Sequence, residues 1–353
     1  MEMEMEMEKK RVCVTGAGGF VASWVVKLLL SNGYIVHGTV RKLGDQKYAH
    51  LNKLERAPAN LKLFKADLLD YDSLRLAIAG CAGVIHVACP VPASALTNPE
   101  ARSHETTRIF SFCNSFSCLS PQVEMLEPAI KGTLNVLKAC SEAKVKRTVY
   151  ISSIAAVMMN PKWPKDRVMD ETCWSDKEYC RATEIWYYLA KTEAERAAFE
   201  YGKQHQLDVV AVNPGYVFGP VLQPTLNTSS LLLVNFLKGI YIQTEPGEAD
   251  SVPNMCWNIV DVRDVAAAVL LAYEESKAEG RYICVAENIM TDYLVKKLRN
   301  LYPDLSYSEN FIESKYAYRL SSEKLQKLGW THRLLEETLL DSIESYREVA
   351  VLD

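Results

Sequence analysis

Apolar runs and amphipathic stretches alternate along most of the first 215 residues. Short runs with strand character lie at residues 12–14, 34–40, 61–68, 83–88, 147–157 and 207–214. Apolar positions at helical spacing follow several of these runs, most clearly over residues 20–32, 123–143 and 185–201. Strands that alternate with helices in this way predict an α/β fold with a doubly wound parallel sheet.

The alternation becomes irregular after residue 215, where Pro and polar residues increase. Residues 261–269 open a helix with acidic residues at its N-terminus, residues 280–285 form a late strand, and residues 334–349 form the last helix. We therefore expect a first domain over residues 10–215 and a smaller C-terminal lobe, mainly substrate-binding, over residues 216–353. Residues 1–9, where Met and Glu alternate, are expected to be a disordered tail.

A glycine-rich turn separates the first strand from the first helix. Its spacing is Gly16-x-x-Gly19-x-x-Ala22, and Gly33 stands where it would cap the end of the helix. Glycines let the backbone approach a pyrophosphate, and the helix N-terminus offers free N–H groups to it. An ordinary turn is the alternative. The succession of strand, turn and helix favours a dinucleotide site, and thus a Rossmann domain over residues 10–215.

Two cations follow the second strand, where an NAD-binding protein carries Asp or Glu for the ribose 2′-hydroxyl. This strand has no acidic residue, and Arg41 and Lys47 come after it. Two positive charges suit the 2′-phosphate of NADPH, while a solvated basic loop is the alternative. Asp67 ends the third strand, where its carboxylate would accept a hydrogen bond from the adenine amino group.

Hydroxyl groups lie in the fifth strand, at Ser152 and Ser153. Farther on, Tyr187 and Lys191 are four residues apart in a helical stretch, so they share one face of the helix. A lysine ammonium beside a phenol lowers the pKa of the phenol, and such a tyrosine can act as a general acid or base. The same spacing also occurs by chance in many helices. His86 is interpreted as a packed strand residue rather than a catalytic one.

Residues 101–120 show neither a helical nor a strand period and are rich in Ser, Phe and Cys. We interpret them as an insertion loop, about residues 100–121, before a helix that begins at Val123. Its deletion is expected to preserve folding and activity, because long insertions in surface loops cost little. Retained intron sequence is one hypothetical origin of the segment, and a lid over the substrate is the functional alternative.

Composition and charge narrow the classes of partner. The net charge of −4 at pH 7 favours neither nucleic acid nor an anionic membrane, and no apolar run reaches the length of a membrane span. The ten cysteines lack metal-ligand spacing, so we expect no metal site and mostly reduced thiols in a cytoplasmic protein. Cys173 and Cys180 are close enough in sequence to pair under oxidation.

Several motifs together resemble the extended short-chain dehydrogenase/reductases. They are residues 15–22 (TGAGGFVA), Ser153, Tyr187 with Lys191, and residues 213–220 (NPGYVFGP). Three finer motifs, residues 41–51 (R-x5-K-x-x-H-L), 170–176 (DETCWSD) and 186–191 (WYYLAK), resemble the plant branch that holds cinnamoyl-CoA reductases and dihydroflavonol reductases. The resemblance covers about residues 10–330, apart from the insertion.

The resemblance implies a role for each matching residue. Ser153, Tyr187 and Lys191 would be the catalytic residues: Ser153 hydrogen-bonds the substrate carbonyl oxygen, Tyr187 protonates it, and Lys191 holds the ribose and tunes Tyr187. NADPH would supply the hydride. Val87, Ala88 and Cys89 would line the nicotinamide ribose, and residues 214–217 the nicotinamide. The full set implied for NADPH/NADP+ is Gly16, Gly19, Phe20, Val21, Arg41, Lys47, Asp67, Leu68, Val87, Ala88, Cys89, Tyr187, Lys191, Pro214, Val217 and Ser229.

The substrate positions depart from both enzymes of the plant branch. As the resemblance has it, cinnamoyl-CoA reductases hold CoA with a His and a Lys three residues apart and an Arg farther on. Leu232 and Asn235 stand at the first two positions here, and only Arg263 matches. Met158 stands where dihydroflavonol reductases place an Asn. We therefore expect an NADPH-dependent reductase of a phenylpropanoid-like free aldehyde or ketone, acting as a monomer or weak dimer.

Other functions stay open. A true cinnamoyl-CoA reductase, which converts a thioester to an aldehyde, and a dihydroflavonol reductase are the nearest alternatives. A sugar-nucleotide epimerase or dehydratase usually holds NAD, which Arg41 and Lys47 disfavour. A non-catalytic NADP-binding sensor or scaffold is the alternative from another class, and the intact set of Ser153, Tyr187 and Lys191 argues against it.

Overall fold

The computed structural model describes residues 11–89, 125–164, 166–239, 252–304, 307–314, 317–349 and 351–352. The predicted tail and the predicted insertion of residues 101–120 lie outside these ranges.

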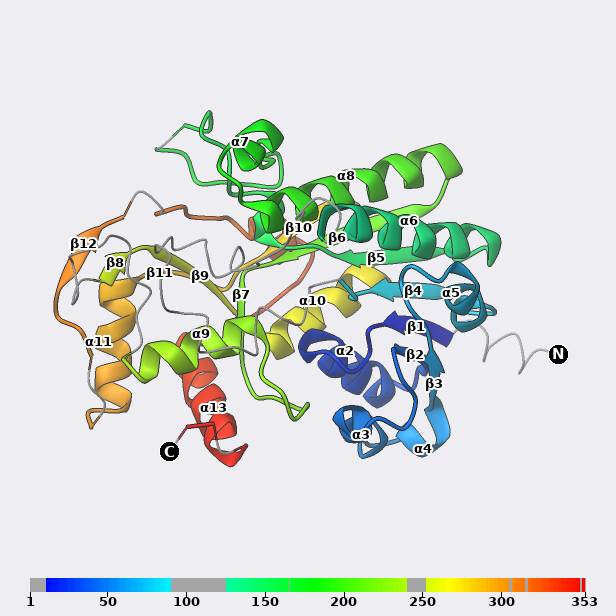
Figure 1. Cartoon of the computed structure of the whole chain (residues 1–353), viewed down its shortest axis with the longest axis horizontal. Coiled ribbons are helices and arrows are strands. Elements are labelled where there is room, and N and C mark those ends of the chain that lie inside the picture. The colour runs from blue at the N-terminus through cyan, green and yellow to red at the C-terminus, as the bar shows by residue number, and fades with distance from the viewer. Residues whose placement is uncertain are drawn as a thin grey trace.

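Seven parallel strands form the central sheet, in the order β10-β6-β5-β4-β1-β2-β3 (Figure 1). Their bounds are β1 (Arg11–Thr15), β2 (Ile35–Val40), β3 (Leu61–Lys65), β4 (Gly83–His86), β5 (Arg147–Ile151), β6 (Asp208–Pro214) and β10 (Gly280–Cys284). The strand order reverses between β1 and β4, which is where doubly wound sheets bind their ligands, outside the carboxyl ends of the strands. The predicted fold class is confirmed.

Helices cover both faces of this sheet. Figure 1 shows α6 (Glu127–Glu142) and α8 (Trp186–His205) over one face, and α2 (Phe20–Ser31) and α10 (Val262–Glu274) over the other. The helix α5 (Tyr71–Ile78) packs beside α6. Buried aliphatic side chains of the strands pack against the apolar stripe of each helix layer, which explains why the strands are nearly continuous apolar runs.

Two strands end earlier than predicted, and hydroxyl groups explain both cases. The strand predicted over residues 147–157 ends at Ile151, because the Ser153 side chain accepts a hydrogen bond from the Ala155 N–H and starts a 3₁₀ turn. The strand predicted over residues 83–88 ends at His86, because the next two N–H groups donate to the hydroxyl of Thr15. Gly33 follows the end of α2 with a φ of +78°, as predicted for a cap.

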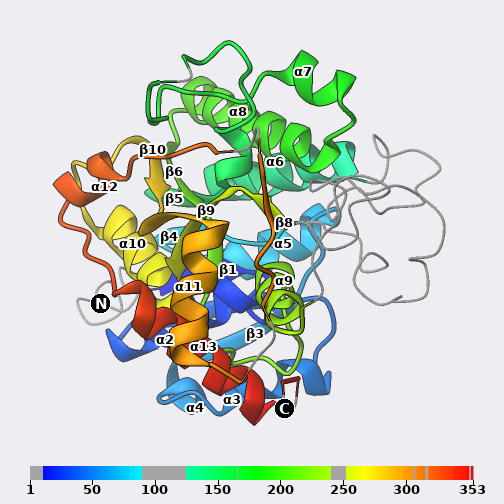
Figure 2. The same ribbon diagram turned by 90° about the vertical axis from the view of Figure 1, so that its left-hand side faces the viewer.

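The C-terminal part of the chain builds a smaller lobe, which Figure 2 turns toward the viewer. Its sheets are β11-β9-β7, formed by β7 (Tyr216–Phe218), β9 (Cys256–Asp261) and β11 (Glu287–Met290), and β12-β8, formed by β8 (Val252–Asn254) and β12 (Phe311–Glu313). Its longer helices are α9 (Thr228–Leu237), α11 (Thr291–Leu301) and α13 (Leu335–Glu348). The short helices of the chain are α3 (Ala49–Asn52), α4 (Ala57–Asn60), α7 (Lys177–Ala182) and α12 (Glu323–Lys327).

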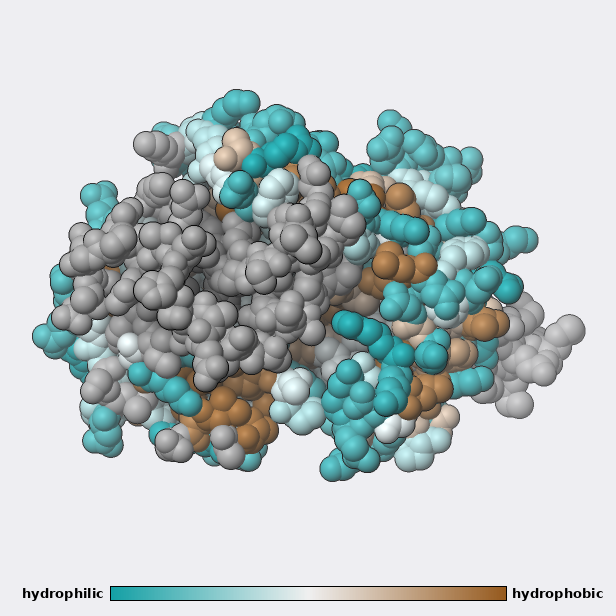
Figure 3. Space-filling view, viewed as in Figure 1, coloured by the Kyte–Doolittle hydropathy of each residue, from teal (hydrophilic) through white to brown (hydrophobic). Residues whose placement is uncertain are grey.

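The lobe and the central sheet share chain segments. Strand β10 and helix α10 come after residue 215 in sequence, yet both belong to the layers around the central sheet. The division at residue 215 therefore stays a prediction. Hydrophobic residues gather on the surface in the region of α9 and α13 (Figure 3). Within the described residues, no helix combines the length and the apolar character that crossing a membrane requires.

Candidate active site

Most of the predicted site residues lie beyond the carboxyl ends of the central strands. The loop at Gly16 follows β1, Arg41 follows β2, Asp67 follows β3, Val87 follows β4 and Ser153 follows β5. Because the strands are parallel, their carboxyl ends share one edge of the sheet. One edge of the sheet thus collects residues that the sequence spreads over more than a hundred positions.

The glycine loop brings two backbone segments into contact. Gly16 has a φ of +67°, its N–H donates to Thr39 Oγ1 at 2.9 Å, and a Cβ added to it would lie 3.0 Å from the Cβ of Ala88. A Cβ at Gly18 would lie 2.1 Å from the ring of Tyr48. The helix that follows has no side-chain cap and no acidic residue in its first turn. No carboxylate of its own first turn therefore neutralises the positive end of the helix dipole. The predicted strand, turn and helix are confirmed, and the loop fits a pyrophosphate.

The hydroxyl of Thr15 links the end of β1 to the end of β4, a contact that the sequence did not predict. This hydroxyl accepts hydrogen bonds from the N–H groups of Val87 and Ala88, at 3.1 Å each, and lies 2.8 Å from His86 Nδ1. The hydroxyl proton therefore points to His86 Nδ1, which leaves the proton of the imidazole on Nε2. Burial, with the nearby charge of Lys191, lowers the pKa of His86 to about 3. His86 is thus a neutral, packed strand residue, as interpreted from the sequence.

The residues predicted to hold the adenosine half of a cofactor surround the ends of β2 and β3. Arg41 is exposed, and Lys47 is exposed with its ammonium 3.5 Å from Asp45 Oδ2. Asp67 is exposed and accepts a hydrogen bond from a backbone N–H two residues on, while the carbonyl of Leu68 accepts one from an asparagine of α6. Their cofactor roles stay predictions.

Lys191 is the buried centre of the predicted catalytic set. Its side chain is 6% exposed, and its ammonium donates to the carbonyl of Ile151, the last residue of β5, at 3.4 Å. Burial alone would lower the pKa of Lys191, but its interactions with Cys89 and Tyr187 outweigh burial and raise that pKa. The ammonium is therefore charged, close to the side chain of Tyr187, and held at the end of β5. Tyr187 itself is half-buried one turn earlier on α8.

The two serines after β5 differ in what their hydroxyls do. Ser152 is buried and its Oγ donates to Glu195 Oε2 at 2.5 Å. Ser153 is half-buried, and its Oγ accepts a hydrogen bond from the Ala155 N–H at 3.1 Å. Because that bond uses a lone pair, the proton of Ser153 is available to a substrate oxygen. The geometry favours Ser153 over Ser152 as the donor, which the sequence preferred only by resemblance.

The predicted substrate positions are spread over three elements. Met158 is buried in an apolar cluster, and Leu232 and Asn235 are half-buried on α9. Arg263, at the start of α10, donates to both oxygens of Asp261 and also forms an ion pair with Asp341 at 2.6 Å. These bonds raise the pKa of Arg263. The single positive charge of its guanidinium thus faces two carboxylates, those of Asp261 and Asp341. The roles of all four residues stay predictions.

A buried ion pair beside the serines was also missed. Glu195 on α8 is fully buried and pairs with Arg281 of β10. Residues 191–196 contain four charged residues, so they look like a solvated helix face in sequence. The usable signal was that Glu195 stands four residues after Lys191, on the same helix face.

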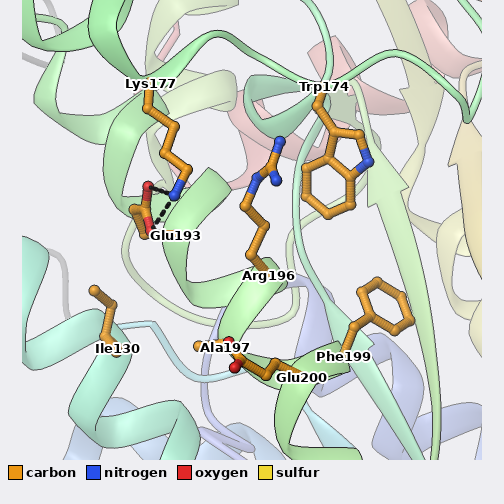
Figure 4. A pocket seen from close by; sticks show the side chains of 8 residues that line it. All are labelled: Ile130, Trp174, Lys177, Glu193, Arg196, Ala197, Phe199 and Glu200. Atoms are coloured by element: carbon orange, nitrogen blue, oxygen red, sulfur yellow. Dashed lines mark hydrogen bonds and ion pairs between the residues drawn. The ribbon is translucent and has the colours of Figure 1, made fainter. Parts of the chain in front are cut away.

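A surface hollow of about 390 Å³ lies on the outer side of α8 (Figure 4). Its lining includes Ile130 of α6, Trp174, and Arg196 of α8, whose guanidinium stacks on the Trp174 ring. None of its lining residues is a predicted site residue, so we do not assign it to the active site. Among the described residues, no group of three or more His, Cys, Asp or Glu side chains is placed to hold a metal ion, and Cys173 and Cys180 are free buried thiols.

Comparison with known proteins decides the family. The model of the 3-beta hydroxysteroid dehydrogenase/isomerase family matches residues 13–293, which is most of the chain. The chain belongs to this family. Cinnamoyl-CoA reductase 2 of Medicago truncatula is 41% identical over 341 residues, covering 96% of this chain and 91% of that protein.

Two solved structures share the fold over nearly the whole chain. Vestitone reductase from alfalfa (Medicago sativa L.) has a TM-score of 0.77 at 29% identity, covering 97% of this chain and 99% of that chain. The yeast methylglyoxal/isovaleraldehyde reductase Gre2, solved with NADPH, has a TM-score of 0.76 at 25% identity, covering 97% of this chain and 100% of that chain. The resemblance stated from the motifs is confirmed, and with it the enzyme class, an oxidoreductase.

Proposed function

We propose that the chain is an NADPH-dependent reductase of a phenylpropanoid-like carbonyl compound, and that it prefers a free aldehyde or ketone to a CoA thioester. The observation that carries the preference is the pairing of Arg263 with Asp261 and Asp341. Arg263 is the one residue of the CoA-binding set that this chain retains, and its charge is already balanced.

The residues at the carboxyl edge of the sheet fit NADPH. The close approach at Gly16 and Gly18 leaves no room for side chains where the pyrophosphate would meet the helix N-terminus. Arg41 and Lys47 are both exposed in the segment that follows β2, and two positive charges there would suit a 2′-phosphate. The solved structure of the similar yeast reductase, which holds NADPH, supports this choice. Asp67 and Leu68 would contact the adenine, and Val87 to Cys89 the nicotinamide ribose.

When bound, NADPH supplies the hydride to the carbonyl carbon. Negative charge then develops on the carbonyl oxygen, and the hydroxyl proton of Ser153 stabilises that charge. Tyr187 donates its phenolic proton to the same oxygen. Lys191 remains charged next to Tyr187, so it stabilises the phenolate that the proton transfer leaves behind. The bond from Lys191 to the Ile151 carbonyl keeps the ammonium in place during the transfer.

The substrate preference follows from charge and polarity. Leu232 cannot donate a hydrogen bond, and Asn235 carries no charge to attract a CoA phosphate. A phosphate brought to Arg263 would also meet the carboxylates of Asp261 and Asp341. Losing two such contacts costs on the order of 100-fold in affinity.

The deciding measurement is kcat/KM for feruloyl-CoA against coniferaldehyde and a panel of small ketones, at saturating NADPH. We expect at least one free carbonyl compound to exceed feruloyl-CoA. The double variant Leu232→His, Asn235→Lys should raise the value for feruloyl-CoA and leave the value for coniferaldehyde near that of the wild type. A feruloyl-CoA value far above every free carbonyl would instead assign the chain as a cinnamoyl-CoA reductase, the function that the name of its 41% identical relative favours.

A further inference from the structure

Glu195 is a carboxylate with no access to solvent. It lies on α8 one turn after Lys191, and its side chain is 0% exposed. A buried carboxylate is costly unless it is paired and hydrogen-bonded on both oxygens. The partners that satisfy it therefore show what the residue is for.

Three donors hold the two oxygens of Glu195. Oε1 accepts from Arg281 Nε at 2.5 Å, and Oε2 accepts from Ser152 Oγ at 2.5 Å. Asn213 Nδ2 also donates to Oε2, at 2.8 Å. The partners come from β10, from the residue after β5 and from β6, so one carboxylate joins three strands of the central sheet to the helix that carries Lys191.

Two of these contacts lead directly to Ser153. Ser152 is its neighbour in the chain, and Asn213 Nδ2 donates a second hydrogen bond, to the carbonyl of Ser153, at 3.1 Å. Glu195 thus fixes the peptide on one side of Ser153 through Ser152 and on the other side through Asn213. The same helix holds Lys191 against the carbonyl of Ile151, two residues before Ser153.

Arg281 completes the arrangement by contacts to backbone carbonyls and to an aromatic ring. Its side chain is 7% exposed, its Nη groups donate to the carbonyls of Ala156, Glu171 and Cys173, and its guanidinium lies 3.6 Å from the centre of the Trp174 ring. The carbonyl of Ala156 belongs to the 3₁₀ turn that follows Ser153. Arg281 therefore holds the end of the turn after Ser153, while the partners of Glu195 hold the residues at its start.

We propose that Glu195, with Arg281, is a positioning residue that sets the hydroxyl of Ser153 relative to Lys191 and Tyr187. The inference rests on the proposed function, because it needs Ser153 as the donor to the substrate oxygen. The link is physical: a glutamine at position 195 would turn an N–H toward one of three N–H or O–H donors. The amide N–H then faces either Arg281 or the pair of Ser152 and Asn213. Each of these residues contacts the segment that carries Ser153, so that segment shifts in either case.

The test is a double-mutant cycle on kcat with NADPH and the best carbonyl substrate found. Glu195→Gln should lower kcat by about 10- to 100-fold, the effect of a misplaced catalytic group, and leave the NADPH dissociation constant from fluorescence titration unchanged. In a Ser153→Ala background the same substitution should have no further effect on kcat, because Glu195 acts through Ser153. An equal factor in both backgrounds, or a folded Glu195→Gln protein with wild-type kcat, overturns the inference.

Glu193→Gln is the matched control, because Glu193 is two residues away on α8 and pairs with Lys177 at 2.8 Å on the rim of the hollow (Figure 4). It should leave kcat at the wild-type value. If Glu195→Gln does not fold, judged by its thermal transition, Ser152→Ala decides instead, since it removes one donor and keeps the pair with Arg281. A wild-type kcat in Ser152→Ala then overturns the inference. A wild-type chain that reduces no carbonyl overturns the proposed function itself, together with the inference.

Discussion

Two arginines of the central sheet, Arg147 of β5 and Arg281 of β10, make the same kind of contact. Arg147, the first residue of the strand, donates from Nε to Asp208 at 2.7 Å, and its Nη groups donate to backbone carbonyls of residues 272, 275, 276 and 278. Arg281 donates from Nε to Glu195, and its Nη groups donate to carbonyls of residues 156, 171 and 173. We call these the Arg147 cluster and the Arg281 cluster.

The two clusters differ in the carboxylate. Asp208 is 43% exposed and its contact to Arg147 faces water, whereas Glu195 is 0% exposed and takes two further donors that flank Ser153. The Arg147 cluster closes a surface loop after α10, while the Arg281 cluster holds the segment beside the predicted catalytic residues. We therefore expect the Arg147 cluster to serve stability and the Arg281 cluster to serve the placement of side chains.

The largest expected effect on kcat comes from a residue near the Arg281 cluster. Tyr187→Phe removes the proposed proton donor and should lower kcat by about 10²- to 10⁴-fold, the usual contribution of a general acid. NADPH should still bind, because the aromatic ring remains. Turnover and NADPH fluorescence titration measure the two outcomes separately. Tyr188→Phe is the control, since Tyr188 is the next residue on α8 and is buried in an apolar cluster. An inactive Tyr188→Phe beside an active Tyr187→Phe would refute the assignment.

Arg41, which follows β2, should decide the preference for NADPH over NADH. Arg41→Ala removes one charge-assisted hydrogen bond to a 2′-phosphate, worth roughly 1.5–3 kcal/mol, so NADPH should bind about 10- to 100-fold more weakly. NADH should bind nearly as before. Lys42→Ala, which changes the neighbouring exposed cation, serves as the control. An equal loss for both cofactors in Arg41→Ala would show that the arginine does not recognise the phosphate.

His86, at the carboxyl end of β4, should make the stability of the chain depend on pH. Burial, with the charge of Lys191, lowers the pKa of His86 to about 3, while an unfolded chain binds the proton near pH 6.5. The unfolded state therefore binds more protons between these values, and the free energy of unfolding falls as pH falls below 6.5. The loss should reach about 2 kcal/mol at pH 5.

Urea unfolding at pH 7.5 and pH 5 measures this effect. His86→Asn should show a smaller difference between the two pH values than the wild type. The control is His205→Asn, because His205 is exposed on α8 and stacks on Tyr201. Equal pH dependence in the wild type and His86→Asn would mean that the buried imidazole does not govern acid stability.

The sheet and its layers follow from local pattern, which is why the sequence predicted them. Each strand is an apolar run, and the glycine loop and the face shared by Tyr187 and Lys191 depend on spacing over a few residues. The end of β5 was placed too late because residues 154–157 are apolar and continue the pattern. What ends the strand is a single bond from the Ala155 N–H to the hydroxyl of Ser153.

The Arg281 cluster could not be predicted in the same way. Glu195 stands close in sequence to the charged residues Glu193 and Arg196, on a helix that looks amphipathic, and its burial depends on Arg281, 86 residues later. Asn213 was noticed as part of a motif, but its two bonds, to Glu195 and to the Ser153 carbonyl, appear only when β5 and β6 lie side by side. Contacts between distant segments, rather than local periodicity, decide that Ser152, and not its neighbour Ser153, donates its hydroxyl proton to Glu195.

The smallest effect on activity should come from the Arg147 cluster, and it tests whether the two clusters differ in kind. Arg147→Met leaves several loop carbonyls without their donor and should cost about 2 kcal/mol, which lowers Tm by about 3 °C in a chain of this length. Asp208→Asn should cost less than about 1 kcal/mol, because the carboxylate is partly exposed and water can replace the contact. Thermal unfolding and kcat under the same conditions are the measurements. Both variants should keep wild-type kcat, since the loop they loosen lies at the amino end of β5. A fall in kcat as large as that expected for Glu195→Gln would show that any loss of an arginine contact in the central sheet disturbs the site.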